Sequence, residues 1–111
     1  ITFKENCPDV RNSKIIDVFN EFKRWGANIV VVDPWVDQLK LQKEHQIKLG
    51  KIDKDNKVDS LIIAVGHNEF RALSANELKS FCNGSKPVIG DVKSIYKKEE
   101  LIKEGFSVFR L

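Results

Sequence analysis

Residues 60–65 read Ser-Leu-Ile-Ile-Ala-Val and are followed by Gly66 and His67. This run predicts a buried β-strand that ends at Gly66 and His67. Residues 28–33, Asn-Ile-Val-Val-Val-Asp, form a run of β-branched residues without polar alternation. That pattern is typical of a strand covered by helices on both faces. Pro34 closes the strand over 28–33, because proline has no N–H to donate and restricts the residue before it.

Helices are predicted between the apolar runs. Apolar residues at spacings of three and four predict a helix over residues 13–25, which Gly26 ends. Ser74 and Glu77 have the spacing of a capping box, which begins a short helix that runs to about Cys82. The other predicted elements are helices over 36–45 and 97–104, the latter capped by Gly105, strands over 1–3, 88–92 and 106–111, a minor edge strand over 47–49 and a solvated loop over 51–57.

The alternation of strands and helices predicts the fold class. It implies right-handed crossovers between parallel strands, and therefore an α/β domain with a doubly wound, mainly parallel sheet of about five strands. The arrangement is Rossmann-like, with αβα layers, and the 111 residues suit a single domain over 1–111. Ligands bind such sheets beyond the carboxyl ends of the strands. This rule selects Lys4, Asp33, Gly66 with His67, and residues 91–93.

The composition and charge of the chain indicate which classes of protein it can belong to. With 41% hydrophobic and 32% charged residues the chain is typical of a soluble globular protein, and a net charge of +3 with interleaved acids disfavours nucleic-acid binding. No apolar run approaches the roughly 18 residues of a membrane span and no signal peptide is recognisable, so we expect a cytoplasmic protein. Cys7 and Cys82 lack CxxC spacing and a nearby histidine cluster, which argues against a zinc site or a disulfide. Because the chain begins within a predicted strand, we expect it to be part of a longer protein.

The motifs that usually bind phosphate are absent from the sequence. The six glycines stand too far apart to form a GxGxxG turn or a P-loop. A phosphate would therefore be held by side-chain cations and by N–H groups at the start of the first helix. Lys4 and Arg11 supply such cations on the loop before the helix over 13–25. From the loop alone, the favoured interpretation is a solvated lysine and an arginine paired with Asp9.

Several other residues leave alternatives open. Cys7 near a helix start is a candidate nucleophile, but a buried thiol is favoured because no histidine is near it in the sequence. Asp33 either occupies the place where a Rossmann acid contacts a ribose or belongs to a turn beneath an aromatic lid. His67 either touches a ligand or, as favoured, caps the strand turn. His45 is expected at the surface and Cys82 in the core.

Residues 2–13 read Thr-Phe-Lys-Glu-Asn-Cys-Pro-Asp-Val-Arg-Asn-Ser. This run resembles the opening of the C-terminal domain of the UDP-glucose/GDP-mannose dehydrogenase family. The Glu-Asn-Cys-Pro-Asp form of the loop is more similar to the branch that acts on UDP-N-acetylhexosamines than to the UDP-glucose branch. The resemblance extends over the rest of the chain, through residues 33–37, 64–67, 69–70, 91–93 and the terminal strand.

The resemblance implies a three-part enzyme, in which an N-terminal Rossmann domain binds NAD, a central helical domain follows, and this chain binds UDP. The complete enzyme would oxidise the C6 alcohol of a UDP-sugar to a carboxylate in two hydride transfers, through a thiohemiacetal on a cysteine. That cysteine lies in a Gly-Phe-Gly-Gly-x-Cys motif which this sequence does not contain. We therefore expect the chain alone to be inactive, and the full-length enzyme to be a homo-oligomer with a role in polysaccharide biosynthesis.

The resemblance also assigns roles to four residues. Phe3 and Lys4 would contact the nucleotide sugar, with Lys4 screening the diphosphate, and Arg11 would reach across the domain cleft towards NAD. Lys93 would contact the substrate at a position where many relatives carry arginine. A lysine keeps the positive charge there but loses the two-pronged fork of the guanidinium. No catalytic residue and no metal ligand is assigned to this chain.

The alternative is a non-enzymatic α/β signalling or ligand-binding module, such as a receiver-type domain with Asp33 as the phosphoryl acceptor. Receiver domains need a further acidic pair after the first strand and a lysine after the fifth. Here only Glu5 follows the first predicted strand directly, and Lys93 follows the fourth long strand. The match to a receiver domain is therefore poor.

Overall fold

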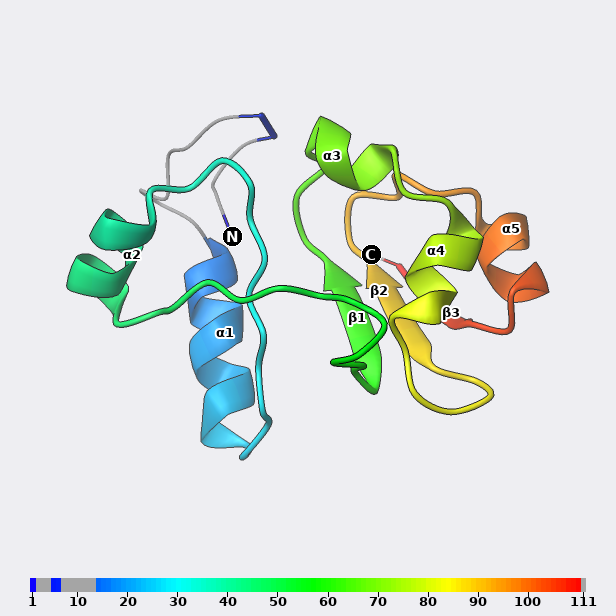
Figure 1. Cartoon of the computed structure of the whole chain (residues 1–111), viewed down its shortest axis with the longest axis horizontal. Helices are drawn as coiled ribbons and strands as arrows, with labels where there is room; N and C mark the ends of the chain where they lie inside the picture. Colours follow the sequence, from blue (N-terminus) through cyan, green and yellow to red (C-terminus); the bar gives the residue numbers. More distant parts are fainter. Residues whose placement is uncertain (2–4, 7–13, 111) are drawn as a thin grey trace. The chain divides into compact units, whose positions relative to one another are not determined.

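The computed structural model of the chain describes residue 1, residues 5–6 and residues 14–110. The chain divides into two compact units, Ile1–Lys51 and Ile52–Leu111. The interpretation of residues 1–111 as one domain stays a prediction. The elements drawn in Figure 1 are, in chain order, α1 (Lys14–Arg24), α2 (Gln38–His45), β1 (Ser60–Ile63), α3 (Asn68–Arg71), α4 (Ala75–Ser80), β2 (Val88–Asp91), α5 (Lys98–Lys103) and β3 (Ser107–Phe109).

The first unit buries apolar residues of its two helices in one cluster. Ile16 of α1 and Leu41 of α2 belong to this cluster together with Ile1 and Ile47. The helix predicted from the apolar spacing is confirmed by α1. Gly26 follows it with a φ of 85°, in the left-handed region that glycine adopts without strain and that commonly ends a helix.

An aspartate fixes the start of α2. The Asp37 carboxylate accepts hydrogen bonds from the N–H groups of Leu39 and Lys40 at 2.9 and 3.3 Å. These amides have no acceptor within the helix, so the cap replaces the bonds that the first turn lacks. The helix predicted over 36–45 is therefore confirmed, but it begins at Gln38 rather than at 36.

The strand predicted over residues 28–33 is not formed within the part of the chain that the structure describes. Val31 makes a single parallel bridge to Leu49, and the N–H of Gly50 donates to the Val31 carbonyl at 2.8 Å. The minor strand predicted over 47–49 is reduced to the same bridge. A strand needs a ladder of hydrogen bonds to a partner strand. A run of β-branched residues indicates only apolar character and a preference for extended backbone.

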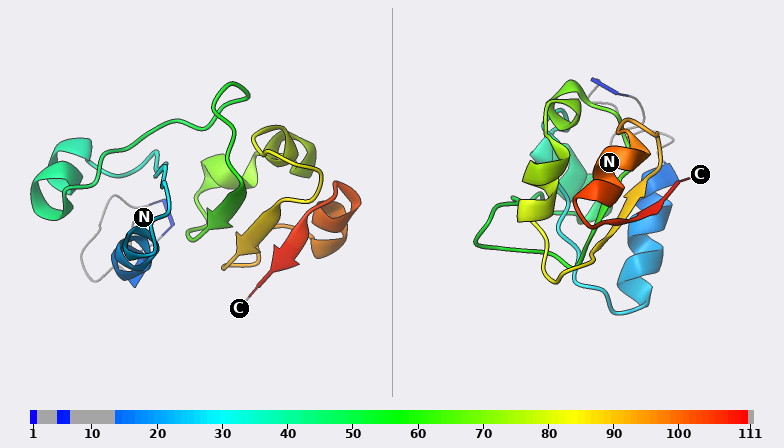
Figure 2. Two further views of the ribbon diagram at one scale, coloured as in Figure 1. Left: turned by 90° about the horizontal axis from the view of Figure 1, so that it is seen from below. Right: turned by 90° about the vertical axis from the view of Figure 1, so that its right-hand side faces the viewer.

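The second unit contains a parallel sheet of three strands in the order β1-β2-β3. Figure 2 shows the three arrows side by side and pointing the same way. In the register of the sheet, Leu61 lies opposite Ile89 and Ile89 lies opposite Val108. The predicted α/β class with a parallel sheet is confirmed. The described residues form three strands where about five were predicted. Residues 28–33 are not a strand, and residues 2–3 of the first predicted strand lie outside the described part.

Helices α4 and α5 pack on one face of this sheet. Leu78 of α4 and Leu101 of α5 are buried in the same cluster as Leu61 and Ile89. Side chains alternate between the faces of a strand, so the neighbouring positions belong to the opposite face. That face carries the exposed side chains of Ile62, Val88 and Phe109.

The local signals in the second unit are confirmed except for one helix. The Ser74 hydroxyl accepts from the Glu77 N–H at 3.1 Å, and the Glu77 carboxylate accepts from the Ser74 N–H at 3.2 Å, which completes the predicted capping box. Gly105 follows α5 with a φ of 98°. Helix α3 was not predicted, because a single turn is too short to show a helical period.

Candidate functional site

The carboxyl ends of β1, β2 and β3 lie at one edge of the sheet, because the three strands are parallel. Gly66 and His67 follow β1, and Lys93 lies in the turn after β2. In Figure 1 this edge is the upper end of the β1 and β2 arrows, where β1 leads into α3. Arg110 follows β3 at the same edge, although the sequence analysis did not select it.

The absence of a side chain at Gly66 leaves room for the Arg71 side chain near the end of β1. The Arg71 Nε donates to the Gly66 carbonyl at 3.0 Å. A Cβ atom at Gly66 would lie 2.8 Å from the Arg71 Nη2 and 3.1 Å from the Ile95 Cγ2, so only glycine leaves both side chains where they are. Arg71 was not predicted as a site residue, because it lies in the unpredicted helix α3.

His67 is part of the interior of the second unit. Its side chain is fully buried, and its ring centroid lies 5.4 Å from that of Phe70. Its carbonyl accepts the N–H groups of Phe70 and Arg71 at 3.0 and 3.1 Å, which starts helix α3. The structure therefore supports the interpretation of His67 as a residue of the strand turn, with the main chain making the turn's hydrogen bonds.

The turn that carries Lys93 is held by a buried carboxylate. Asp91 is fully buried, and its two carboxylate oxygens accept the N–H groups of Ile95 and Tyr96, each at 3.0 Å. Its carbonyl accepts the Ser94 N–H at 3.1 Å. Ser94 has a φ of 53°, in the left-handed region that costs a residue with a Cβ some strain. The Lys93 side chain is exposed, whereas the backbone on both sides of it is fixed.

Arg110 joins the end of β3 to this turn. One of its terminal nitrogens, Nη2, donates to the Tyr96 carbonyl and lies 3.7 Å from the Asp91 carboxylate. The Tyr96 hydroxyl in turn donates to the Phe70 carbonyl. Among the described residues, Arg110 Nε is buried and has no hydrogen-bond partner. Burying a donor without a hydrogen-bond partner costs about 1–3 kcal/mol of folding free energy. The position of the Arg110 side chain is therefore unfavourable for its Nε.

We expect alkaline pH to destabilise the unmodified chain more than a Tyr96→Phe variant. Burial and then the negative charge of Asp91 raise the pKa of Tyr96 from 10.0 to about 12. A pKa raised by folding stabilises the fold fully below pH 10, and this contribution is lost as the pH rises through about 12. Two pKa units correspond to about 3 kcal/mol, and solvent screening of the partly exposed Tyr96 reduces the expected loss to about 2 kcal/mol. Urea denaturation of both proteins below pH 10 and above pH 12 measures it, and equal losses would contradict the prediction.

Asp33 organises a turn in the first unit. It is 6% exposed, and one carboxylate oxygen accepts the N–H groups of Trp35 and Val36 at 2.8 and 3.2 Å. The other oxygen accepts from the main-chain nitrogen of Ile1 at 2.8 Å. Of the two interpretations of Asp33, these contacts support the turn. They also weaken the receiver-type alternative, because a phosphoryl acceptor has to be accessible to its donor.

Three of the four residues assigned to binding, Phe3, Lys4 and Arg11, lie outside the described residues, as does Cys7. Cys82 is buried in the core, as predicted, and burial raises the pKa of its thiol. His45 is partly exposed, with Nε2 4.0 Å from the Glu44 carboxylate. Within the described residues, no group of three or more His, Cys, Asp or Glu side chains could hold a metal ion.

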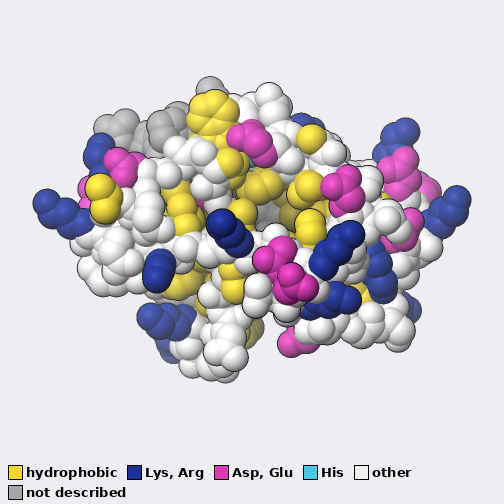
Figure 3. Space-filling view, in the orientation of Figure 1, with side chains coloured by type: hydrophobic (Ala, Val, Ile, Leu, Met, Phe, Trp, Pro, Cys, Tyr) yellow, Lys and Arg dark blue, Asp and Glu magenta, His cyan; other side chains and the backbone are white. Residues whose placement is uncertain are grey.

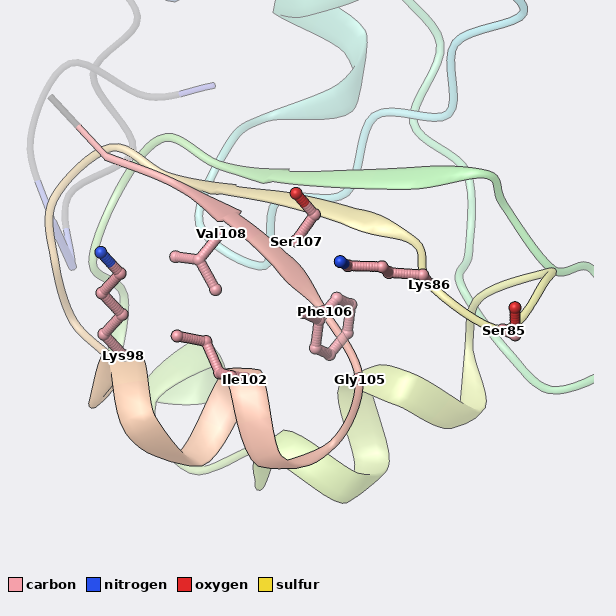
Figure 4. Close-up of a pocket in the computed structure, with 8 residues that line it drawn as sticks. All are labelled: Ser85, Lys86, Lys98, Ile102, Gly105, Phe106, Ser107 and Val108. Carbon is pink, nitrogen blue, oxygen red and sulfur yellow. The ribbon is translucent and has the colours of Figure 1, made fainter.

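A groove of about 600 Å³ lies beside the outer strand β3, between that strand and α5. Figure 4 shows the Phe106 and Ile102 side chains between the two lysines, Lys86 and Lys98, that belong to its lining. Lys93, the described member of the residues predicted to bind substrate or cofactor, does not line this groove. On the face drawn in Figure 3, basic and acidic side chains are interspersed. The helices of the described residues are all too short or too polar to cross a membrane.

Comparison with known proteins identifies relatives across the chain. A family model for the UDP binding domain of the UDP-glucose/GDP-mannose dehydrogenase family matches residues 1–98. The chain is 36% identical over 99 residues to a UDP-N-acetyl-D-glucosamine 6-dehydrogenase of Salmonella typhi, an alignment that covers 89% of this chain and 23% of the relative. It is 33% identical over 108 residues to a UDP-glucose 6-dehydrogenase of Rhizobium meliloti, covering 96% of this chain and 24% of the relative.

A solved structure supports the fold. The crystal structure of an NDP-N-acetyl-D-galactosaminuronic acid dehydrogenase from Methanosarcina mazei superposes with a TM-score of 0.84 at 22% sequence identity, over 97% of this chain and 22% of that protein. The chain therefore spans less than a quarter of the length of this protein.

Proposed function

This chain belongs to the UDP-glucose/GDP-mannose dehydrogenase family, and we propose that it binds the UDP group of a nucleotide-sugar substrate. The match of the UDP binding domain to residues 1–98 carries this proposal. The complete enzyme would transfer hydride from the sugar C6 alcohol to NAD. Because the chain covers 23% of a related 6-dehydrogenase, the NAD-binding and central domains would belong to the rest of the same polypeptide, and this chain alone would be inactive.

We assign the substrate contacts to Phe3, Lys4 and Lys93, and a contact on the NAD side to Arg11. Lys93 is the described member of this group, and it is exposed at the carboxyl edge of β2. An ammonium there is a compact positive charge that can pair with a diphosphate oxygen. Partial burial beneath a bound nucleotide would make that pairing stronger than a fully solvated ion pair.

We further propose a UDP-N-acetylhexosamine as the substrate, bound by a homo-oligomeric enzyme in the cytoplasm. The form of the loop over residues 5–9 supports this choice, as does the 36% identity to a UDP-N-acetyl-D-glucosamine 6-dehydrogenase. The sugar would be recognised mainly by the other domains, so this chain would bind UDP and different UDP-sugars with similar affinity.

Isothermal titration calorimetry of the chain with UDP tests the proposal, because it measures the dissociation constant of UDP. Lys93→Ala is expected to weaken UDP binding about tenfold, which corresponds to about 1.4 kcal/mol, because one cation on the diphosphate is lost. Uridine lacks the diphosphate, so its weaker binding should not change in this variant. Lys57→Ala is the matched control, since it removes an exposed lysine that precedes β1 at the opposite edge of the sheet. If the unmodified chain does not bind UDP, the proposed function is wrong.

A further inference from the structure

The turn over residues 91–96 is held at both ends by hydrogen bonds. The Asp91 carboxylate accepts both N–H groups at the far end of the turn, from Ile95 and Tyr96. The Val92 N–H donates to the Ile63 carbonyl at 3.0 Å, which attaches the turn to the end of β1. Lys93 lies directly between these anchored positions. The direction in which its side chain leaves the sheet edge is therefore set by the bonds of Asp91.

Arg110, which directly follows β3, contacts this turn through its side chain. Its guanidinium binds the turn at both ends, through the Asp91 carboxylate and the Tyr96 carbonyl. Both contacts are made by the same terminal nitrogen, Nη2. The buried and unpartnered Nε of Arg110 shows that this placement does not satisfy the arginine itself.

We propose that Asp91 and Arg110 are positioning residues, which orient the Lys93 turn for the diphosphate of the nucleotide sugar. This inference rests on the proposed function, because it needs Lys93 to contact the substrate. Arg110 would act through the turn and would make no contact with the ligand. Its Nη2 donates to the Tyr96 carbonyl and forms an ion pair with the Asp91 carboxylate. The sequence analysis assigned no role to Arg110.

A double-mutant cycle on UDP binding tests this inference. Arg110→Ala is expected to raise the dissociation constant of UDP by up to about tenfold, close to the effect of Lys93→Ala. In a background that already carries Lys93→Ala, removal of Arg110 should have no further effect, because no lysine remains to be oriented. Arg110→Lys should restore part of the affinity, since it keeps a positive charge beside Asp91 on a side chain of different shape. Arg24→Ala is the matched control, because Arg24 is an exposed arginine of α1.

Amide hydrogen exchange supplies a measurement that does not depend on UDP. Exchange at Ile95 and Tyr96 should accelerate in Arg110→Ala and stay unchanged in Arg24→Ala, while exchange in the sheet stays slow in both variants. Slow exchange in the sheet also shows that Arg110→Ala is folded. If Arg110→Ala does not fold, Arg110→Lys is measured in its place.

The outcomes separate the inference from the proposed function. An unmodified chain that does not bind UDP contradicts both. If UDP binds but the effects of Arg110→Ala and Lys93→Ala add, Arg110 acts independently of Lys93 and the inference is wrong. Unchanged exchange at Ile95 and Tyr96 in Arg110→Ala would overturn it as well, because the turn would then be held without the arginine.

Discussion

Leu101→Ala is expected to lower the free energy of unfolding of the second unit by about 2–5 kcal/mol. Leu101 is fully buried on α5, in a cluster with Leu78, Ile89 and Phe106. The substitution removes apolar contacts and leaves a cavity, and the parallel strands beneath α5 limit how far the cluster can relax. This loss is a large fraction of the stability of an ordinary small domain.

Hydrogen exchange of the amides in β1 and β2 measures this loss in the second unit. The matched control is Ile102→Ala, the next residue of the same helix, whose side chain is 53% exposed. The control should lower the free energy of unfolding by less than about 1 kcal/mol, because little apolar surface is withdrawn from water at that position. Similar losses in the two variants would show that the cluster around Leu101 is not the core of this unit.

Leu41→Ala is expected to have an effect of the same size on the first unit, about 2–5 kcal/mol. Leu41 of α2 is fully buried in the cluster that also contains Ile16 and Ile47. Both tryptophans, Trp25 and Trp35, belong to this unit, so their fluorescence follows its unfolding in urea.

The control for Leu41→Ala lies on the same helix. Leu39 is 81% exposed, and Leu39→Ala should change the unfolding midpoint of the tryptophan signal only slightly. The same experiment tests the prediction of one domain over 1–111. If the residues unfold as one cooperative domain, Leu41→Ala accelerates exchange in β1 and β2 as well. Separate responses of the tryptophan signal and the exchange signal would contradict that prediction.

The sequence predicted the helices better than the strands, for a physical reason. Helix α1 and the capping box of α4 depend on residues three or four positions apart, so their signals are complete within the local sequence. A strand depends on a partner elsewhere in the chain. Residues 28–33 and 60–65 have similar apolar runs, but only the second run finds a ladder in the described structure, along β2.

The candidate site was predicted in part. The rule that ligands bind beyond strand ends selected Lys93, and the structure places it exposed at that edge. Applied to the last strand, the same rule would have selected Arg110. The pairing of Arg110 with Asp91 and Tyr96 had no signal in the sequence, because no local spacing relates a residue after β3 to a turn after β2.

By itself, the sequence determined the family, the alternation of helices and strands, the helix caps and the presence of a lysine after β2. These features are encoded in local spacing, in turn chemistry and in the long motif over residues 2–13. The tertiary structure decided which apolar runs became strands and how the Lys93 turn is held. Arg110 and Tyr96 are 14 residues apart, and Tyr96 and Phe70 are 26 apart, so these bonds form only when the parallel sheet brings three strand ends to one edge. Hydrogen bonds between residues that are far apart in the sequence form only when the fold brings the intervening chain round into a loop. No local sequence pattern encodes that arrangement.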